Sequence, residues 1–278
     1  MSIELVTKFL PYVDEIFYTE SKKSLLTNQE FSWDGAEYVK IYKIGTAAMN
    51  DYDRTGEKNF YHRYGEAENL NATTETMRLV KDRSFTFVID KLDSNETGST
   101  LAAATALARQ LREVVLPEVD KYVYGQMVSH AGTKPEAIVL NAENIYSEIV
   151  KATTALDEAE VPESGRVLLV TPTTYQIMKQ SSEIVLNANV GEDMRIKGVI
   201  SNLDGMNVIK VASKKLPENF GFMVAHPCAT VAPTKLADYR THEDPPGING
   251  TLTEGRINYD AFVLENKAKA IYYQAVTA

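Results

Sequence analysis

The chain has 278 residues, of which 44% are hydrophobic, and its 29 basic and 38 acidic side chains give a net charge of −9. This length and apolar content allow a buried core in one large or two modest domains, which excludes a disordered chain. The acidic balance, with basic residues gathered only in isolated pairs at 22–23 and 214–215, disfavours direct recognition of nucleic acid, and a single cysteine excludes an intramolecular disulfide or a multi-cysteine metal site.

The N-terminal residues predict an amphipathic segment. Apolar side chains in residues 5–17 recur at spacings of three and four, which is typical of a helix, and Pro11 interrupts the pattern. Two placements stay open: the segment docks on its own domain, or it lies across a neighbouring subunit. It lacks the basic start and unbroken apolar run of a signal peptide, and no later stretch reaches the roughly 18 apolar residues of a membrane span. We therefore expect a cytosolic protein that does not cross a membrane.

Two segments predict β-strands that pair with each other. Residues 38–44 read YVKIYKI and residues 84–90 read SFTFVID, both rich in β-branched and aromatic side chains at alternating positions. The stretch between them is polar, punctuated by glycine and rich in tyrosine. Long insertions without a core signal are usually functional, so we interpret this stretch as a protruding arm.

A long helix is predicted over residues 99–130. Ser99 can cap it, alanines at 102–104, 106 and 108 favour it, and Leu101, Leu107 and Leu111 begin an apolar stripe. Pro117 is expected to kink or restart the helix, and the helical spacing continues to an end near Gly132.

The rest of the chain alternates short helices and strands. Helices are expected at 144–159 and 172–180, and strands at 166–170, 208–211, 221–225, 260–264 and 270–273. The sequence Asp-Pro-Pro-Gly at 244–247 marks an exposed loop. Because no βαβ unit is repeated, the pattern predicts an α+β fold.

The residues at 51–62 partly match a calcium-binding loop. Asp51, Asp53 and Thr55 stand at the first, third and fifth positions, with Gly56 at the sixth. The twelfth position should be a glutamate that binds the ion through both oxygens, but it is His62. We therefore interpret the stretch as a solvated arm whose charges meet a partner.

No pattern in the sequence predicts catalysis. His226 and Cys228 are the only histidine and cysteine that lie close together, and strand geometry would place them on one face. Neither an orienting carboxylate nor a helix N-terminus stands nearby, so a strand end with a small buried cysteine is the better interpretation. Phosphate-binding loops, HExxH and GxSxG are missing from the sequence. We expect no enzyme, no cofactor and no metal site.

The tyrosines of the arm favour protein contacts over base stacking. Tyr52, Tyr61 and Tyr64 stand beside Asp53 and Glu57 rather than among lysines and arginines. Stacking proteins interleave aromatic and basic residues, whereas tyrosine is enriched wherever proteins meet.

Several local stretches resemble one family along most of the chain. LARQLREVVLPEVDKYVYGQM is similar to the spine helix of the tailed-bacteriophage major capsid protein of the Hong Kong 97 type, and RVLLVTPTTYQIMK is similar to its central strand and helix. VISNLDGMNVIKV and GRINYDAFVLENKAKAIY resemble the segments that follow. The likeness is one of collinear order and not of a single motif.

The resemblance implies a Hong Kong 97-type fold with an N-terminal arm, an extended β-hairpin loop, a long spine helix, a peripheral domain and an axial domain. These parts would be an N-arm at 1–35, an extended loop at 36–80, a peripheral domain at 81–141 and 230–264 with the spine helix at 99–130, and an axial domain at 142–229 and 265–278.

The resemblance also implies a function and partners. Copies of the chain would assemble into pentamers and hexamers of an icosahedral phage head that encloses double-stranded DNA without sequence-specific binding. The head would be built in the host bacterial cytoplasm. A portal protein would be a partner, and a decoration protein could be another. Because the sequence starts at Met1 without a large cleaved region, a separate scaffolding protein is expected.

Candidate assembly contacts lie on the arm and on the loop near 243–250. They are Asp51, Asp53, Arg54, Lys58, Tyr61, Glu243 and Asp244. One family member cross-links a lysine of this loop to an asparagine of a neighbour; Lys58 and Asn249 are the corresponding residue types here, and we expect no cross-link.

Two other functions are weighed against the phage capsid. An encapsulin, which is a nanocompartment shell enclosing a cargo enzyme, has a similar fold and length, but the long polar arm and the N-terminal segment favour the capsid. A soluble α+β enzyme would need a site that the sequence does not display.

Overall fold

The computed structural model describes residues 21–28, 38–55, 61–65, 69, 71–96, 103–186 and 201–277. The chain divides into two compact units, one made of Met1–Ser32 with Val80–Ala278 and the other of Trp33–Leu79. The amphipathic helix predicted at 5–17 lies outside the described residues. None of the described helices is both long enough and apolar enough to span a bilayer.

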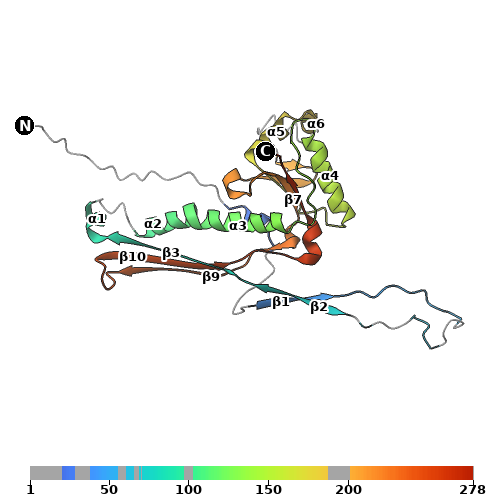
Figure 1. Cartoon of the computed structure of the whole chain (residues 1–278), viewed down its shortest axis with the longest axis horizontal. Helices are drawn as coiled ribbons and strands as arrows, with labels where there is room; N and C mark the ends of the chain where they lie inside the picture. Colours follow the sequence, from blue (N-terminus) through green and yellow to red (C-terminus); the bar gives the residue numbers. More distant parts are fainter. Residues whose placement is uncertain are drawn as a thin grey trace, which may run out of the picture. The chain divides into compact units, whose positions relative to one another are not determined.

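The smaller unit is built on an antiparallel hairpin. Strand β1 (Tyr38–Ile44) pairs with β2 (Ala72–Arg78) in a register that joins Tyr38 to Arg78 and Ile44 to Ala72. The two strands lie side by side in Figure 1. The predicted strand at 38–44 is confirmed, but its predicted pairing with 84–90 is wrong. Its partner reads ATTETMR, a polar strand whose threonines are β-branched, and its polarity had placed it in the predicted arm.

Residues 84–90 pair instead with the C-terminal part of the chain. They belong to β3 (Lys81–Asp90), which joins β10 (Gly250–Tyr259) and β9 (Thr234–Glu243) in an antiparallel sheet of order β3-β10-β9. Gly255 stands at the centre of β10, where the rings of Phe85 and Tyr239 stack 6.1 Å apart. A Cβ atom at Gly255 would come within 2.3 Å of the Phe85 ring, so only glycine leaves the two rings this space.

The predicted long helix is confirmed from residue 103 onward. It comprises α2 (Ala103–Gln110), one π-helical turn η2 (Leu111–Val115) and α3 (Leu116–Ser129), which ends slightly before the predicted Gly132. Pro117 falls in the first turn of α3, just after the widened turn. A proline inside a helix loses a hydrogen bond and clashes with the carbonyl four residues earlier, and a π turn at that place accommodates both effects without ending the helix.

The largest sheet has five strands in the order β12-β7-β4-β6-β5. Strands β4 (Val167–Val170) and β6 (Met206–Lys210) are parallel, with α5 (Pro172–Gln180) and α6 (Ser182–Leu186) between them in the chain. The antiparallel strands are β7 (Phe220–Ala225), β12 (Ile271–Ala275) and β5 (Asn202–Leu203).

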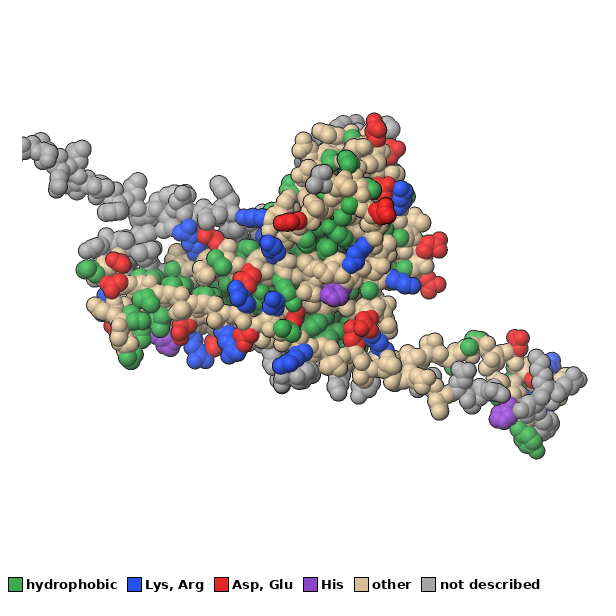
Figure 2. All heavy atoms as spheres, viewed as in Figure 1, with side chains coloured by type: hydrophobic (Ala, Val, Ile, Leu, Met, Phe, Trp, Pro, Cys, Tyr) green, Lys and Arg blue, Asp and Glu red, His purple; other side chains and the backbone are tan. Residues whose placement is uncertain are grey.

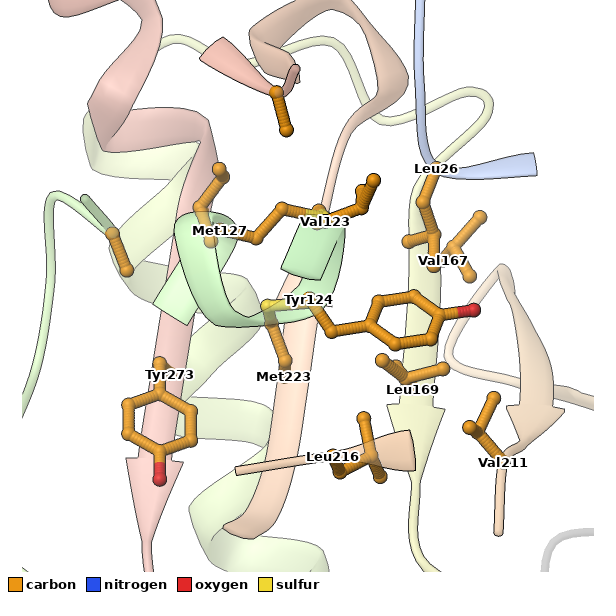
Figure 3. Packing of buried hydrophobic residues seen from close by; sticks show 14 of the residues in the cluster. Leu26, Val123, Tyr124, Met127, Val167, Leu169, Val211, Leu216, Met223 and Tyr273 are labelled. Carbon is orange, nitrogen blue, oxygen red and sulfur yellow. The ribbon is translucent and has the colours of Figure 1, made fainter. Parts of the chain in front are cut away.

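Both faces of this sheet are buried. One face contributes Leu169 and Met223, which pack with Tyr124 and Met127 of α3, as Figure 3 shows. The other face contributes Leu168 and packs against α4 (Ile145–Glu158) and α5. Because each strand is covered on both sides, β4 and β7 read as continuous apolar runs, VLLV and FGFMVA. The predicted helices at 144–159 and 172–180 and the predicted strands at 166–170, 208–211 and 221–225 are thus confirmed to within a few residues.

Short elements complete the unit. Helix α1 (Lys91–Glu96) follows β3, and strand β8 (Thr230–Val231) pairs with β11 (Phe262–Val263). The predicted strand at 260–264 is therefore shorter than expected, whereas the strand predicted at 270–273 is confirmed as β12. Single 3₁₀ turns stand at Lys23–Leu25, Ser213–Lys215, Pro227–Ala229 and Glu265–Ala270.

Candidate functional site

The smaller unit exposes large apolar side chains to solvent. Met49 is 99% exposed, Tyr61 89% and Tyr64 83%. We call the smaller unit, Trp33–Leu79, the arm. Among its residues whose side chains the structure describes, only Met77 is buried. These exposed side chains are the candidates for contact with another molecule. We call residues 45–71, which join β1 to β2, the arm tip.

The described part of the arm tip is held by local hydrogen bonds. The backbone N–H of Asp53 donates to the carbonyl of Arg63 (2.9 Å), and the N–H of Gly65 donates to the carbonyl of His62 (3.0 Å). The rings of Tyr52 and Tyr64 meet edge to face with centroids 5.0 Å apart. The described part of the tip is therefore ordered by these local contacts, and none of its described side chains is buried.

In the described part of the calcium-loop pattern, the carboxylate of Asp53 closes a turn. Oδ1 of Asp53 accepts hydrogen bonds from the backbone N–H of Thr55 (3.2 Å) and from its hydroxyl (3.1 Å), so this carboxylate closes a turn. Gly56 lies outside the described residues. Throughout the described ranges, no group of three or more His, Cys, Asp or Glu side chains is close enough to hold a metal.

The predicted contact residues of the arm fall into different environments. Asp51, Arg54 and Tyr61 are exposed, whereas Asp53 is half-buried and closes the turn. Lys58 lies outside the described residues.

The loop between β9 and β10 is tied to the start of α1. Nζ of Lys91 lies 3.2 Å from Oδ2 of Asp244, and the backbone N–H of Lys91 donates to the carbonyl of Asn249. Asp244 has a φ of 45°, and its N–H donates to the carbonyl of Gly250 (2.8 Å), which closes the loop. The predicted contact Glu243 is exposed at the end of β9. The carboxylate of Asp244 thus already pairs within its own chain.

The outer face of the β3-β10-β9 sheet carries a row of charges that was not predicted from the sequence. Arg256 pairs with Asp82 (Nε to Oδ1, 2.9 Å), Arg240 with Asp238 (2.8 Å), and Nε2 of His242 lies 3.6 Å from Glu254. Figure 2 shows acidic and basic side chains interspersed along this part of the molecule. The signal was present in the alternation of charged positions within 234–243 and 250–259.

The histidine and cysteine pair is not a catalytic dyad. Residues Pro227–Ala229 form a 3₁₀ turn, so the strand geometry expected for this pair is wrong. Nδ1 of His226 accepts a hydrogen bond from the backbone N–H of Cys228 (3.2 Å), and Nε2 lies 3.1 Å from the carbonyl oxygen of Ser164. The ring therefore caps a turn. Burial raises the pKa of the half-buried Cys228 thiol, which disfavours the reactive thiolate.

A cavity between the helix and the sheet is small. It measures about 120 Å³ and is lined by Phe85, Val114, Val115 and Ile257 among others, with Glu118 and Arg83 joined at its edge by a contact of 2.7 Å. Ligand pockets usually measure roughly 300–1,000 Å³. The cavity is a space between packed elements and too small for a typical substrate.

Two buried carboxylates, Asp120 on α3 and Asp260 bonded to α3, were not identified from the sequence. Asp120 is fully buried; its Oδ2 lies 3.0 Å from Nζ of Lys215, and its Oδ1 accepts from the hydroxyl of Ser21 (2.5 Å). Asp260 is 4% exposed and accepts a hydrogen bond from the hydroxyl of Tyr122 (2.8 Å). Burial, together with this hydrogen bond, raises the pKa of Tyr122 above its ordinary range. Apolar residues stand three, four and seven positions after Asp120, at 123, 124 and 127, and this helical spacing could have placed Asp120 on the buried face.

Solved structures resemble the whole chain, although no protein-family model and no curated protein sequence matches it. A structure of Mycobacterium phage Che8 has a TM-score of 0.78 at 18% identity, covering 98% of this chain and 97% of that one. The capsid of cyanophage P-SCSP1u has a TM-score of 0.80 at 11% identity, covering 99% and 93%. A virus-like particle from Pyrococcus furiosus has a TM-score of 0.56 at 12% identity, covering 92% of each chain.

At these identities the likeness is one of fold. The chain shares its mixed helix and sheet fold, over nearly its full length, with phage capsid structures.

Proposed function

We propose that the chain is the major capsid protein of a tailed phage, which assembles with copies of itself into pentamers and hexamers of an icosahedral shell around double-stranded DNA. The observation that carries the proposal is the arm, which exposes large apolar side chains and, among the side chains that the structure describes, buries only Met77. A folded subunit gains little from such a segment, whereas an assembly can bury it. The shared fold with phage capsid structures supports the same function.

The proposal assigns the parts of the chain as the Hong Kong 97-type resemblance implies. The unit Trp33–Leu79 would be the extended loop, α2 to α3 the spine helix, the β3-β10-β9 sheet the peripheral domain and the five-stranded sheet the axial domain. Residues 1–35 would be the N-arm. The contacts between subunits would include Asp51, Arg54 and Tyr61 of the arm tip and Glu243 beside the β9–β10 loop.

In this function the chain is structural and not an enzyme. A scaffolding protein, a portal protein and packaged DNA would be its partners, and the host bacterial cytoplasm the place of assembly. The net charge of −9 suits an inner wall past which DNA slides, since phosphates and an acidic surface repel each other.

Electron microscopy of the purified protein tests the proposal. We expect closed shells in negative stain, with the protein alone or with its scaffold. Shells isolated from cells should contain DNA that a nuclease does not reach. A protein that stays monomeric or dimeric with its scaffold present would contradict the proposal.

Removal of the arm tip tests the observation that carries it. A variant lacking 51–64 should fold, with an unchanged unfolding transition of the larger unit, and should form few or no shells. A matched control replaces Glu160 and Glu163, which lie on the larger unit outside any predicted contact, by glutamine, and should assemble normally. Normal shells from the deletion variant would show that the arm tip has no role in assembly.

The second candidate is a nanocompartment shell that encloses a cargo enzyme. The resemblance to the virus-like particle from Pyrococcus furiosus favours it, but its TM-score of 0.56 is lower than the 0.78 and 0.80 of the two phage structures. Mass spectrometry of purified shells separates the two functions, because a nanocompartment would contain a single abundant second protein in place of DNA.

A further inference from the structure

The chain leaves the larger unit near Ser32 and returns to it near Val80, and we call these two points the passages. Residues close to both passages form hydrogen bonds with the same small part of the larger unit, around β8 and β11. On the incoming side, the backbone N–H of Asn28 donates to the carbonyl of Thr230 in β8 (2.7 Å), and Asn28 forms a parallel bridge with Val231. Leu26, two residues earlier, is fully buried in the core. The chain is therefore held to β8 shortly before it enters the arm.

On the returning side, Val80 is held by the carboxylate of Asp260. The backbone N–H of Val80 donates to Oδ2 of Asp260 at 2.8 Å. Asp260 stands two residues before β11, which pairs with β8, and its own N–H donates to the carbonyl of Pro233 (3.2 Å), just beyond β8. Both passages are thus joined to the pair β8–β11.

The same carboxylate joins these elements to α3. Oδ1 of Asp260 accepts hydrogen bonds from the hydroxyl of Tyr122 (2.8 Å) and from the N–H of Ala261 (2.8 Å). The Tyr122 ring meets Tyr259 edge to face at 5.7 Å, and Nζ of Lys81 lies 4.9 Å from its centroid. The two oxygens of Asp260 therefore bind different elements, since Oδ1 holds α3 and the start of β11 while Oδ2 holds Val80.

Burying a carboxylate costs more free energy than burying an apolar side chain of similar size. Asp260 is 4% exposed, and hydrogen-bond donors rather than an ion pair within the described residues satisfy it. Burying a charge costs free energy that hydrogen bonds only partly offset, so its presence indicates a role that an apolar side chain could not fill. Connecting a backbone N–H on one element to a hydroxyl on another is such a role.

We propose that Asp260 is a positioning residue that fixes the root of the arm, by which we mean the two passages near Ser32 and Val80. Together with β8 and β11, Asp260 ties both passages to α3. The inference rests on the proposed function only where it concerns assembly. Fixing the points at which the chain leaves the larger unit removes conformational freedom before copies of the chain associate, which lowers the entropy lost on association.

The substitution Asp260→Asn tests the proposal, because it keeps the shape of the side chain and changes one oxygen. The asparagine Oδ1 can still accept from Tyr122 and Ala261, whereas its NH₂ group faces the Val80 N–H and cannot accept. Hydrogen exchange on the unassembled subunit should show the Val80 amide exchanging about tenfold faster or more, since a hydrogen bond to a charged group is lost. The rest of the larger unit should keep its protection.

Two controls separate positioning from general stability. Asp82→Asn removes an exposed carboxylate of the neighbouring strand β3 and should leave Val80 exchange unchanged. Tyr122→Phe removes the hydroxyl of α3 and should raise Val80 exchange by a smaller factor than Asp260→Asn. Unchanged Val80 exchange in both Asp260→Asn and Tyr122→Phe would overturn the proposal, as would faster exchange spread evenly over the larger unit. An Asp260→Asn chain that does not fold would overturn it too, because Asp260 would then support the core.

Assembly of the same variants separates this inference from the proposed function. Asp260→Asn subunits should form shells more slowly than the wild type, and Asp82→Asn subunits at the wild-type rate. A faster-exchanging Val80 with wild-type shell formation would overturn the assembly part of the inference. If wild-type chains form no shells, the proposed function fails while the exchange result still decides the role of Asp260 in the root.

Discussion

The arm and the five-stranded sheet are built on opposite principles. In the sheet every residue of β4 and β7 is buried, and both faces are covered by helices. In the arm the backbone is ordered by one hairpin and a few turns, while Met49, Tyr61 and Tyr64 stay in solvent. The sheet gains its free energy of folding by burial within one chain, whereas these exposed side chains of the arm add little to the folding of the single chain. Substitutions should therefore act on stability in the sheet and on association in the arm.

The largest loss of stability should come from breaking the buried ion pair between Asp120 of α3 and Lys215. Asp120→Ala leaves Lys215 buried without its carboxylate, and breaking a buried pair in this way costs about 3–5 kcal/mol. Chemical denaturation of the unassembled subunit measures the loss. Replacing both partners by apolar residues, as in Asp120→Leu with Lys215→Met, should recover much of it; an equal loss in the double variant would contradict the explanation by an uncompensated charge.

A cavity in the sheet should cost nearly as much. Leu168→Ala removes a fully buried side chain from the central strand β4 and should lower the free energy of unfolding by about 2–5 kcal/mol. The matched change in the arm, Ile44→Ala, removes a side chain that is 67% exposed and should change it by less than about 0.5 kcal/mol. Similar losses in the free energy of unfolding from both substitutions would contradict the difference that we describe between the sheet and the arm.

Filling the space above Gly255 should destabilise the three-stranded sheet by about 1–3 kcal/mol, the usual cost of overpacking. Gly255→Val brings side-chain atoms into the stacked rings of Phe85 and Tyr239. The companion variant Gly255→Val with Phe85→Ala makes room for the new side chain and should lose less than the sum of the two single changes. Strict additivity in thermal unfolding would show that the ring contact is not the cause.

The arm should respond in association and not in stability. Tyr61→Ala removes a side chain that is 89% exposed, so the unfolding transition should stay within about 0.5 kcal/mol of the wild type. Because buried tyrosines often carry much of the energy of an interface, shell formation should be slower or incomplete. Light scattering during assembly measures this, with Val139→Ala, an exposed change in the larger unit, as control. Wild-type assembly by Tyr61→Ala would remove this residue from the contacts.

The smallest effect should be the pH dependence of an exposed pair on β3. The hydrogen bonds from Arg256 lower the pKa of Asp82 below its ordinary value. A carboxyl group whose pKa is lower in the folded state stabilises the fold above its unfolded pKa, and this contribution is lost as the pH falls through the folded pKa. The difference in unfolding midpoint between wild type and Asp82→Asn should therefore be small at pH 7 and shrink below about pH 4. A difference that grows on acidification would contradict this sign.

The sequence predicted most elements of the larger unit. Continuous apolar runs such as VLLV identify strands covered on both faces, and the apolar spacing in 144–159 identifies a helix with one buried face. The positions of Asp53 and His226 follow from local backbone turns, in which the side chain of each residue accepts a hydrogen bond from the backbone N–H two residues later. What the sequence did not predict is which strands pair, since both 38–44 and 84–90 have strand propensity and neither specifies a partner.

Local sequence patterns, then, determined by themselves where most helices and strands form, because helical spacing and strand alternation are properties of neighbouring residues; the polar strand β2 is an exception. Only the tertiary structure decided that 84–90 joins β10, that Asp120 meets Lys215 and that Asp260 holds Val80. These partners are 95 residues apart in the ion pair and 180 apart at the root of the arm. Contacts over such separations arise from how whole elements pack, so no stretch of sequence around either residue carries their signal.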